Sequence, residues 1–272
     1  NSMVCKLSAW QAELFKKVII DDLSTTLTKH DTSLAFNQID AELYKGNLSG
    51  SLVYDQASHT SDGRLKLQNA KLDKMPFKAH KEGKTQYAGD LSGEIEFATH
   101  MDDKRGLLID GGADITIRDG LIWKLPVIFD FVNLLNIPGE FASISQLDSK
   151  LKFEEDRIHI QELQTNGSIV ALSGEGYVWW KTLGADIRFR SRLLRKVPFI
   201  MAPINSLTEK RLLGRLDKPD WQSFAVFRNR PKEPTDPTLD PKTKSGSGEK
   251  PTEPRADNDD LSQVNTGRNR PR

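Results

Sequence analysis

The residue types that could perform acid–base or metal chemistry are few and widely separated in this chain of 272 residues. Its five histidines lie far apart, without the HxH or HExxH spacing of common zinc sites. Acidic residues are adjacent at Asp21-Asp22, at Asp102-Asp103 and at Glu154-Glu155-Asp156. Neighbouring side chains of a strand point to opposite faces, so adjacent carboxylates do not converge on one substrate. We therefore expect no metal site and no enzyme activity.

The other reactive signatures are incomplete. Cys5 is the only cysteine, so the chain forms neither an internal disulfide nor a CxxC redox pair. The GxG of residues 174–176 lacks a third glycine and a following helix, so it predicts no phosphate-binding loop, and no cofactor is expected. A hydrolase of cell-wall or glycan substrates stays open as a third class, which two carboxylates converging in a pocket would favour.

The overall charge argues against nucleic acid as a partner. Lys and Arg number 39 against 38 for Asp and Glu, which gives a formal charge of +1 without the basic surplus of a nucleic-acid binder. The longest apolar stretch, Leu125 to Leu135, is interrupted by polar residues and is far shorter than the roughly 20 residues that span a bilayer.

Composition divides the chain into three parts. Residues 230–272 hold seven of the thirteen prolines and four hydrophobic residues, so they predict a disordered tail rich in proline and charge. Residues 17–229 have the hydrophobic content of one globular domain. Residues 1–16 are expected to form a short N-terminal helix or a linker, and the lack of an initiating Met predicts that the chain is processed or cut from a longer one.

Alternation of apolar and polar residues predicts strands through most of the domain. Leu48, Leu52 and Tyr54 share one parity, and the pattern recurs near residues 91–97, 115–117, 151–160 and 185–189. Turn signals separate these segments as an antiparallel meander requires, and they are Ser61-Asp62-Gly63, Asp110-Gly111-Gly112, Arg118-Asp119-Gly120, Glu155-Asp156 and Asn166-Gly167-Ser168. We predict a mainly β protein with a long, curved, mostly antiparallel sheet, shaped as a groove or half-barrel.

Two or three short amphipathic helices are expected beside the sheet. Pro126 can begin a helix that places Ile128, Phe131, Val132 and Leu135 on one face and ends before Pro138-Gly139. A second candidate covers Ile204 to Leu213, and a weaker one covers Ser8 to Lys16.

The predicted sheet also contains an internal repeat. Residues 65–76 align without gaps on residues 115–126, with eight of twelve positions identical or similar. Residues 47–54 align in the same way on residues 90–97, and the two blocks occur in the same order. These alignments predict a repeated β module. Such a sheet must curl, and it either closes on itself or leaves an apolar trough open to a hydrophobic ligand.

Three segments resemble the C-terminal region of bacterial AsmA-like proteins. They are IDAELYKGNLSGSLVYD at 39–55, the stretch from GGADITIRDGLIWKLP to ALSGEGYVW at 111–179, and LLGRLDKPDW at 212–221. The resemblance covers about residues 18 to 221 and implies repeated β-groove domains that form a hydrophobic trough across the periplasm. It also implies an inner-membrane anchor outside this sequence and a role in phospholipid transport between membranes and in outer-membrane integrity.

Two sets of residues are candidate lipid contacts. Apolar residues of the strands and of the helix that begins at Pro126 would line the trough, unless the helix packs its apolar face against its own sheet. This set is Trp123, Ile128, Phe131, Val132, Leu135, Ile115, Ile117, Phe153 and Phe189. A basic stripe would contact anionic headgroups or, alternatively, form a solvated strand face. This set is Arg188, Arg190, Arg192, Arg195 and Lys196.

The sequence thus predicts a non-enzymatic, lipid-binding β-groove segment of the bacterial envelope. Its expected partners are phospholipid or another lipid, the membrane surface and envelope proteins, and its expected location is the periplasm. The alternative is a structural or assembly module that docks protein partners through its sheet edges.

Overall fold

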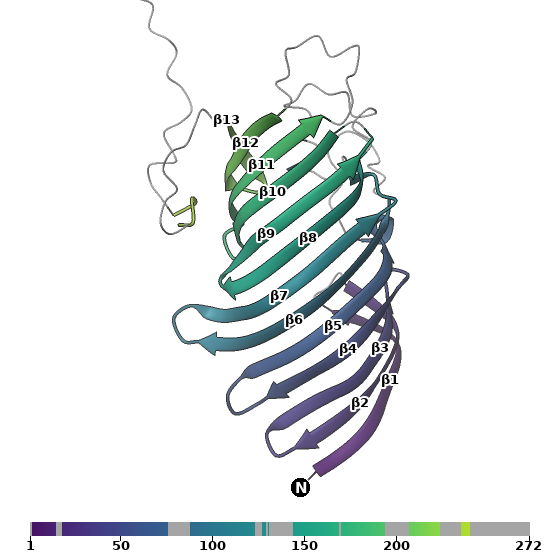
Figure 1. The fold of residues 1–272 in the computed structure, drawn as a ribbon. Coiled ribbons are helices and arrows are strands. Elements are labelled where there is room, and N and C mark those ends of the chain that lie inside the picture. The colour runs from purple at the N-terminus through teal and green to yellow at the C-terminus, as the bar shows by residue number, and fades with distance from the viewer. Residues whose placement is uncertain are drawn as a thin grey trace, which may run out of the picture.

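A computed structural model describes residues 2–14, 18–75, 88–122, 127–128, 130, 144–168, 170–193, 207–223 and 235–239. In these ranges thirteen strands form one antiparallel sheet, in which each strand pairs with its neighbours in sequence. The sheet curves strongly without closing into a barrel (Figure 1). The strands are β1 Ser2–Leu14, β2 Val18–His30, β3 Ser33–Leu43, β4 Gly46–Asp55, β5 Thr60–Lys71, β6 Asp90–Asp102, β7 Gly106–Arg118, β8 Ile144–Glu155, β9 Arg157–Gly167, β10 Val170–Trp179, β11 Gly184–Leu193, β12 Leu207–Arg215 and β13 Lys218–Ser223.

The predicted fold class is confirmed, because the described chain is mainly β and forms a single curved antiparallel sheet. Alternation sets this outcome, since every second side chain of a strand points to the same face. In β5 the apolar residues Leu65 and Leu67 are half-buried, while Arg64, Lys66 and Gln68 are exposed. The apolar side chains therefore gather on one face of the sheet.

Two of the predicted helices are wrong within the described residues. The Ser8–Lys16 helix falls mostly on β1, which pairs with β2 from Ser2 to Leu14. The Ile204–Leu213 helix falls on β12 from Leu207 onward. Pairing with neighbouring strands satisfies the backbone of these segments and overrides a weak local helical pattern. A short 3-10 helix, η1 Leu72–Lys74, was not predicted.

The predicted helix that begins at Pro126 is described at three positions, Val127, Ile128 and Asp130, which are helical. Its other residues lie outside the described part of the chain. The predicted tail, residues 230–272, also lies outside it except for residues 235–239. There Asp236 is buried and accepts a hydrogen bond of 2.6 Å from the Thr182 hydroxyl.

Two of the five predicted turns lie inside strands. Ser61-Asp62-Gly63 belongs to β5, and Asp110-Gly111-Gly112 belongs to β7. Glycine serves a different purpose at these positions. A Cβ atom built on Gly63 would lie 2.6 Å from Cζ of Phe97, so the absence of a side chain makes room for the ring of the neighbouring strand. The other three turn signals coincide with strand ends.

The sequence repeat corresponds to two hairpins with the same strand register. Gly50 of β4 lies opposite Leu65 of β5, and the aligned residues Gly93 and Ile115 lie opposite each other in the β6–β7 hairpin. The motif Leu-Ser-Gly of both copies occurs a third time at residues 172–174 in β10, where Gly174 lies opposite Phe189. In all three places a bulky residue lies beside a glycine, which relieves crowding on the inner side of a bent sheet.

Candidate functional site

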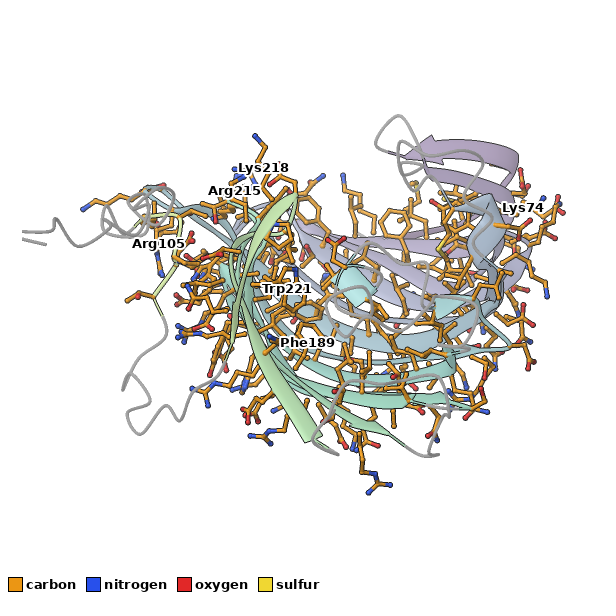
Figure 2. All side chains as sticks on the ribbon, turned by 90° about the horizontal axis from the view of Figure 1, so that it is seen from above. Lys74, Arg105, Phe189, Arg215, Lys218 and Trp221 are labelled. Carbon is orange, nitrogen blue, oxygen red and sulfur yellow. The ribbon has the colours of Figure 1, made fainter. Side chains whose placement is uncertain are left out.

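The inside of the curve carries most of the apolar side chains of the described strands. Figure 2 shows Phe189 and Trp221 inside the curved sheet, with ring centroids 5.6 Å apart, whereas Arg105 and Lys74 lie outside it. Residues that lie directly opposite each other in an antiparallel register share a face. The register therefore assigns the paired strand residues to the concave or the convex face, except at the β-bulges.

Part of the concave face is apolar but incompletely covered, and we call it the open apolar face. Its residues come from β3 to β8 and are half-buried, apart from the exposed Gly111. One row across the strands runs through Phe36, Leu52, Gly63, Phe97, Gly111 and Phe153, and a second runs through Gly50, Leu65, Ile95, Ala113 and Leu151. A third row contains Leu48, Leu67 and Ile115.

The inward positions of β4 to β7 carry no Asp, Glu, Lys or Arg. Charged residues of these strands alternate onto the convex face, where Arg64 pairs with Glu96 and lies 3.7 Å from Glu94. Aliphatic side chains, phenylalanine rings and glycines make up most of the concave surface at these strands. Such a surface offers dispersion contacts and almost no polar partners.

The other part of the concave face is a closed core. Residues of β7 to β12 pack with Leu72, Ile122 and Ile128 into one cluster of buried side chains. Ile187, Phe189 and Leu212 are less than 5% exposed. The side chains of Leu72, Val127 and Ile128 therefore lie on the concave side and help to cover this part of the sheet.

The predicted lipid contacts fall into both parts of the concave face. Ile115 and Phe153 belong to the open apolar face, where a ligand can reach them. Ile117, Ile128 and Phe189 are buried in the core cluster. The burial of Ile128 agrees with the alternative prediction that the helix packs its apolar face against its own sheet. The remaining candidates, Trp123, Phe131, Val132 and Leu135, lie outside the described residues.

Three of the five predicted headgroup contacts lie on the other side of the sheet. Arg188, Arg190 and Arg192 alternate with the inward-facing Phe189, so they belong to the convex face. Acidic neighbours accompany them, because Glu175 lies opposite Arg188 in the register and Arg190 approaches Glu209 to 3.5 Å. A lipid on the open apolar face is separated from these arginines by the thickness of the sheet, and membrane contact by the arginines stays a prediction. Arg195 and Lys196 lie outside the described residues.

Most residues of the open apolar face were not among the sequence candidates. Leu65, Ile95 and Phe97 already belonged to the alternating pattern, which was the signal that could have identified them. Their exposure could not be read from the sequence, because alternation reports which face a residue occupies and not whether another element covers that face.

Shallow depressions also occur between side chains of the convex face. One of them encloses about 470 Å³ and is lined in part by Glu94, Glu96 and Asp114. Glu94 and Glu96 are about half-exposed and are ion-paired with Arg64. This arrangement is typical of a charged sheet surface in water, and it gives no specific support to a hydrolase. Among the described residues, no group of three or more His, Cys, Asp or Glu could hold a metal ion.

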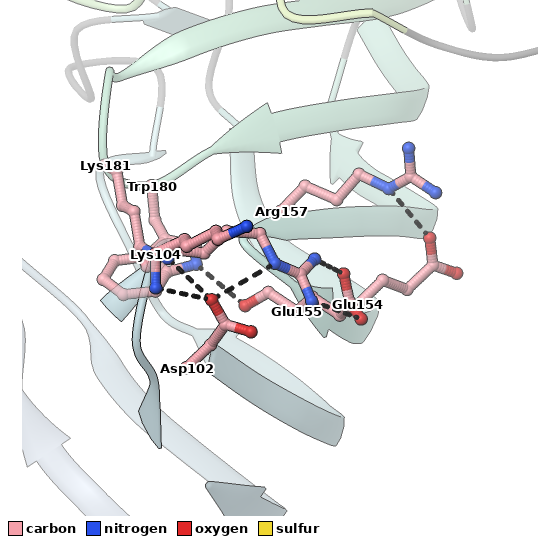
Figure 3. A network of polar contacts seen from close by, with 8 residues as sticks. Asp102, Lys104, Glu154, Glu155, Arg157, Trp180 and Lys181 are labelled. Carbon is pink, nitrogen blue, oxygen red and sulfur yellow. Dashed lines mark hydrogen bonds and ion pairs between the residues drawn. The ribbon is translucent and has the colours of Figure 1, made fainter. Parts of the chain in front are cut away.

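Three hairpin tips are joined along one rim of the sheet by polar contacts, which we call the rim network (Figure 3). Arg105 of the β6–β7 tip donates to Glu155 of the β8–β9 tip. Trp180 of the β10–β11 tip donates from Nε1 to the carbonyl oxygen of Glu155 at 3.4 Å. The ammonium of Lys181 donates to the carbonyl oxygen of Arg105 and lies 5.1 Å from the Trp180 ring centre. The rim network therefore ties β6 to β11 at their ends.

The acidic groups of this rim should make stability fall in acid. Hydrogen bonds from the backbone N–H groups of Arg105 and Lys104 lower the pKa of Asp102. Burial disfavours the ionised form of Glu154, but Lys152 and Arg157 outweigh burial and leave its pKa lowered. Because folding lowers these pKa values, the stabilisation is complete above the ordinary carboxylate pKa of about 4 and is lost as pH falls through the folded-state values.

We expect the melting temperature to stay level from neutral pH to about pH 5 and then to decrease, with a shallower decrease for Asp102→Asn than for the unaltered protein. Thermal unfolding followed by circular dichroism between pH 7 and pH 2.5 measures this. Asp103→Asn, at the neighbouring exposed position, is the control. If the melting temperatures of Asp102→Asn and of the unaltered protein decreased equally steeply below pH 5, the stabilising role of the ionised Asp102 would be contradicted.

Comparisons of the chain with protein-family models, with curated proteins and with solved structures find no match. In the part of the chain that the structure describes, no helix has the length and apolar character needed to cross a membrane.

Proposed function

We propose that this protein binds lipid without catalysing a reaction, and that it holds acyl chains against the open apolar face. The observation that carries the proposal is a charge-free apolar surface at the centre of the sheet that remains half-exposed. Central strands of a water-soluble sheet normally bury their apolar face against another element. An apolar ligand that covers β4 to β7 would supply the missing contact.

Hydrocarbon suits this surface better than a peptide does. A peptide brings backbone N–H and C=O groups that must find hydrogen-bonding partners when they are buried. The concave positions of β4 to β7 provide almost none. An acyl chain needs no such partners and gains about 0.8 kcal/mol for each methylene group removed from water. The headgroup can stay in water, so the surface binds a class of lipid and does not need a specific polar contact.

The wider setting follows from the same proposal. A groove of this kind in an AsmA-like protein would carry phospholipid through the periplasm and support outer-membrane integrity. The open, curved, one-sided sheet and the repeated hairpin support this assignment. The membrane-associated part of such a protein would lie outside the present sequence.

A second function, docking of a protein partner, is favoured by the edge of β1. Met3, Val4 and Leu7 are 57%, 65% and 43% exposed on this long outermost strand. The opposite edge, β13, is short and carries Lys218, Pro219 and Asp220, which are features that hinder pairing with another strand. The contrast suggests that the β1 edge accepts a further strand.

Mass spectrometry of organic extracts tests the first function. Protein purified without detergent from bacterial cells is expected to carry phospholipid in a fixed molar ratio, whereas a similarly purified soluble control carries only traces. Lipid-free protein that also takes up no lipid from phosphatidylethanolamine–phosphatidylglycerol vesicles would contradict the proposal.

A further inference from the structure

The side chains of the concave face are more exposed at the middle strands than near one end of the sheet, which is unusual. The inward-facing residues Leu52, Leu65 and Ile95 of the middle strands are half-buried, whereas Ile187 of β11 and Leu212 of β12, near one end of the sheet, are 4% and 0% exposed. A bare sheet would show similar exposure along its length. Something must therefore cover the concave face at β9 to β12 and at the ends of β7 and β8 that carry Ile117, Ile144 and Leu147. Most other inward positions of β3 to β8 stay half-exposed.

Among the described residues, the chain segments that follow the two repeated hairpins contribute to this cover. Leu72 comes directly after β5, and its repeat equivalent Ile122 comes shortly after β7. Leu72, Ile122, Val127 and Ile128 belong to or pack against the buried core cluster, and we call these four residues the cap. Leu72 and Ile122 are 2% and 0% exposed. Each copy of the repeat thus supplies one aliphatic residue to the cap, at equivalent positions of the two copies.

Backbone hydrogen bonds fix the cap in position. The N–H of Leu72 donates to the carbonyl oxygen of Gly89 at 3.0 Å, and the N–H of Leu121 donates to that of Ala88 at 3.0 Å. The N–H of Gly120 donates to the carbonyl oxygen of Ser145 at 2.9 Å. The chain at Leu72 and just before Ile122 is therefore tied to backbone groups next to the sheet, which holds these two cap residues in place.

Resting on the proposed function, we propose that the open apolar face is a groove with one closed end. The cap and the core behind it stop the hydrocarbon, so an acyl chain lies across the strands between β3 and β8 with its methyl end toward the cap. The cap side chains are all aliphatic, so this end offers nothing to a polar headgroup. The headgroup therefore lies toward β3, where the face is open.

The dimensions agree with a single lipid. Five strand spacings from β3 to β8 give a length of about 24 Å. The acyl chains of one membrane leaflet occupy half of a hydrocarbon core about 30 Å thick, or about 15 Å. The open part of the groove is therefore long enough for one extended chain and too short for two chains end to end.

Photocrosslinking tests both the position and the direction of the chain. The full protein is loaded with either of two phosphatidylcholines, which carry a diazirine near the carboxyl end or at the methyl end of one acyl chain. After irradiation, peptides are mapped by mass spectrometry. We expect methyl-end adducts on β7 and β8, carboxyl-end adducts on β3 to β5, and at least threefold fewer adducts on β10 to β12 with either probe.

Removing side chains of the cap should lengthen the groove. Ile122→Ala and Ile128→Ala are expected to raise methyl-end adducts on β9 to β11 at least threefold, while Ala98→Ser, on the exposed convex face, leaves the map unchanged. The experiment on the unaltered protein is sufficient to overturn the inference. Adducts spread evenly over β3 to β12 would contradict a closed end, and so would identical adduct maps for the two probes. Failure of both probes to form any adduct would instead contradict lipid binding itself.

Discussion

Leu65→Asp should reduce the lipid that co-purifies with the protein at least tenfold. Leu65 lies on the open apolar face, between Gly50 of β4 and Ile95 of β6. A bound acyl chain would remove the new carboxylate from water, which costs several kcal/mol for an unpaired charge. Tenfold weaker binding corresponds to about 1.4 kcal/mol, so the penalty is more than sufficient. The side chain of Asp is too short to carry its charge out of the groove.

Gln68→Asp is the matched control, because Gln68 lies in the same strand, is exposed and belongs to the convex face. It introduces the same charge without touching the groove, so its lipid content should equal that of the unaltered protein. Both variants should retain the circular dichroism of a β protein, since Leu65 is only half-buried. Equal lipid loss in the two variants would remove the open apolar face as the binding surface.

Gly111→Ala should destabilise the fold by about 3 kcal/mol or more, the largest effect expected from adding one methyl group. Gly111 has φ 143°, and a Cβ atom there would lie 2.1 Å from the carbonyl oxygen of Glu96. A backbone conformation of this kind costs an L-residue about 1–3 kcal/mol, and overpacking adds a similar amount. The carbonyl oxygen of Glu96 cannot move aside easily, because it belongs to the backbone of β6.

The adjacent Gly112→Ala provides the comparison. Gly112 points to the convex face, has no left-handed φ, and its nearest contact for a Cβ atom is 3.2 Å from the carbonyl oxygen of Leu151. We expect its effect to be about 1 kcal/mol or less. Urea unfolding of the two variants measures the difference. Equal free energies of unfolding would mean that the bend at Gly111 does not depend on glycine.

The sequence was most informative about the faces of the strands. Alternation at Leu48, Leu52 and Tyr54 correctly predicted an apolar parity, and the repeat correctly paired residues 47–54 with 90–97, because both depend on neighbours along one strand. Glycine was interpreted less well. At Gly63 the residue makes space for Phe97 of another strand, a reason that local turn preferences do not contain.

The candidate site was only partly predictable. Ile115 and Phe153 were identified, whereas Ile117 and Phe189 share their parity but are covered by residues distant in sequence. The arginines at 188, 190 and 192 were correctly predicted to share a polar face. That face is the convex one, opposite the groove, and it also carries the acidic residues Glu175 and Glu209. Cover and charge pairing both depend on the sheet's curvature and register, which alternation alone does not specify.

The common register of the two repeated hairpins gives the groove a unit of length. Each hairpin adds two strands, or about 10 Å, and places its glycine opposite a bulky neighbour as the preceding hairpin does. Duplicating or deleting such a unit would therefore change the length of the groove in steps without moving any apolar residue to the wrong face. The capacity of this architecture for longer hydrocarbon could evolve by copying hairpins instead of redesigning them.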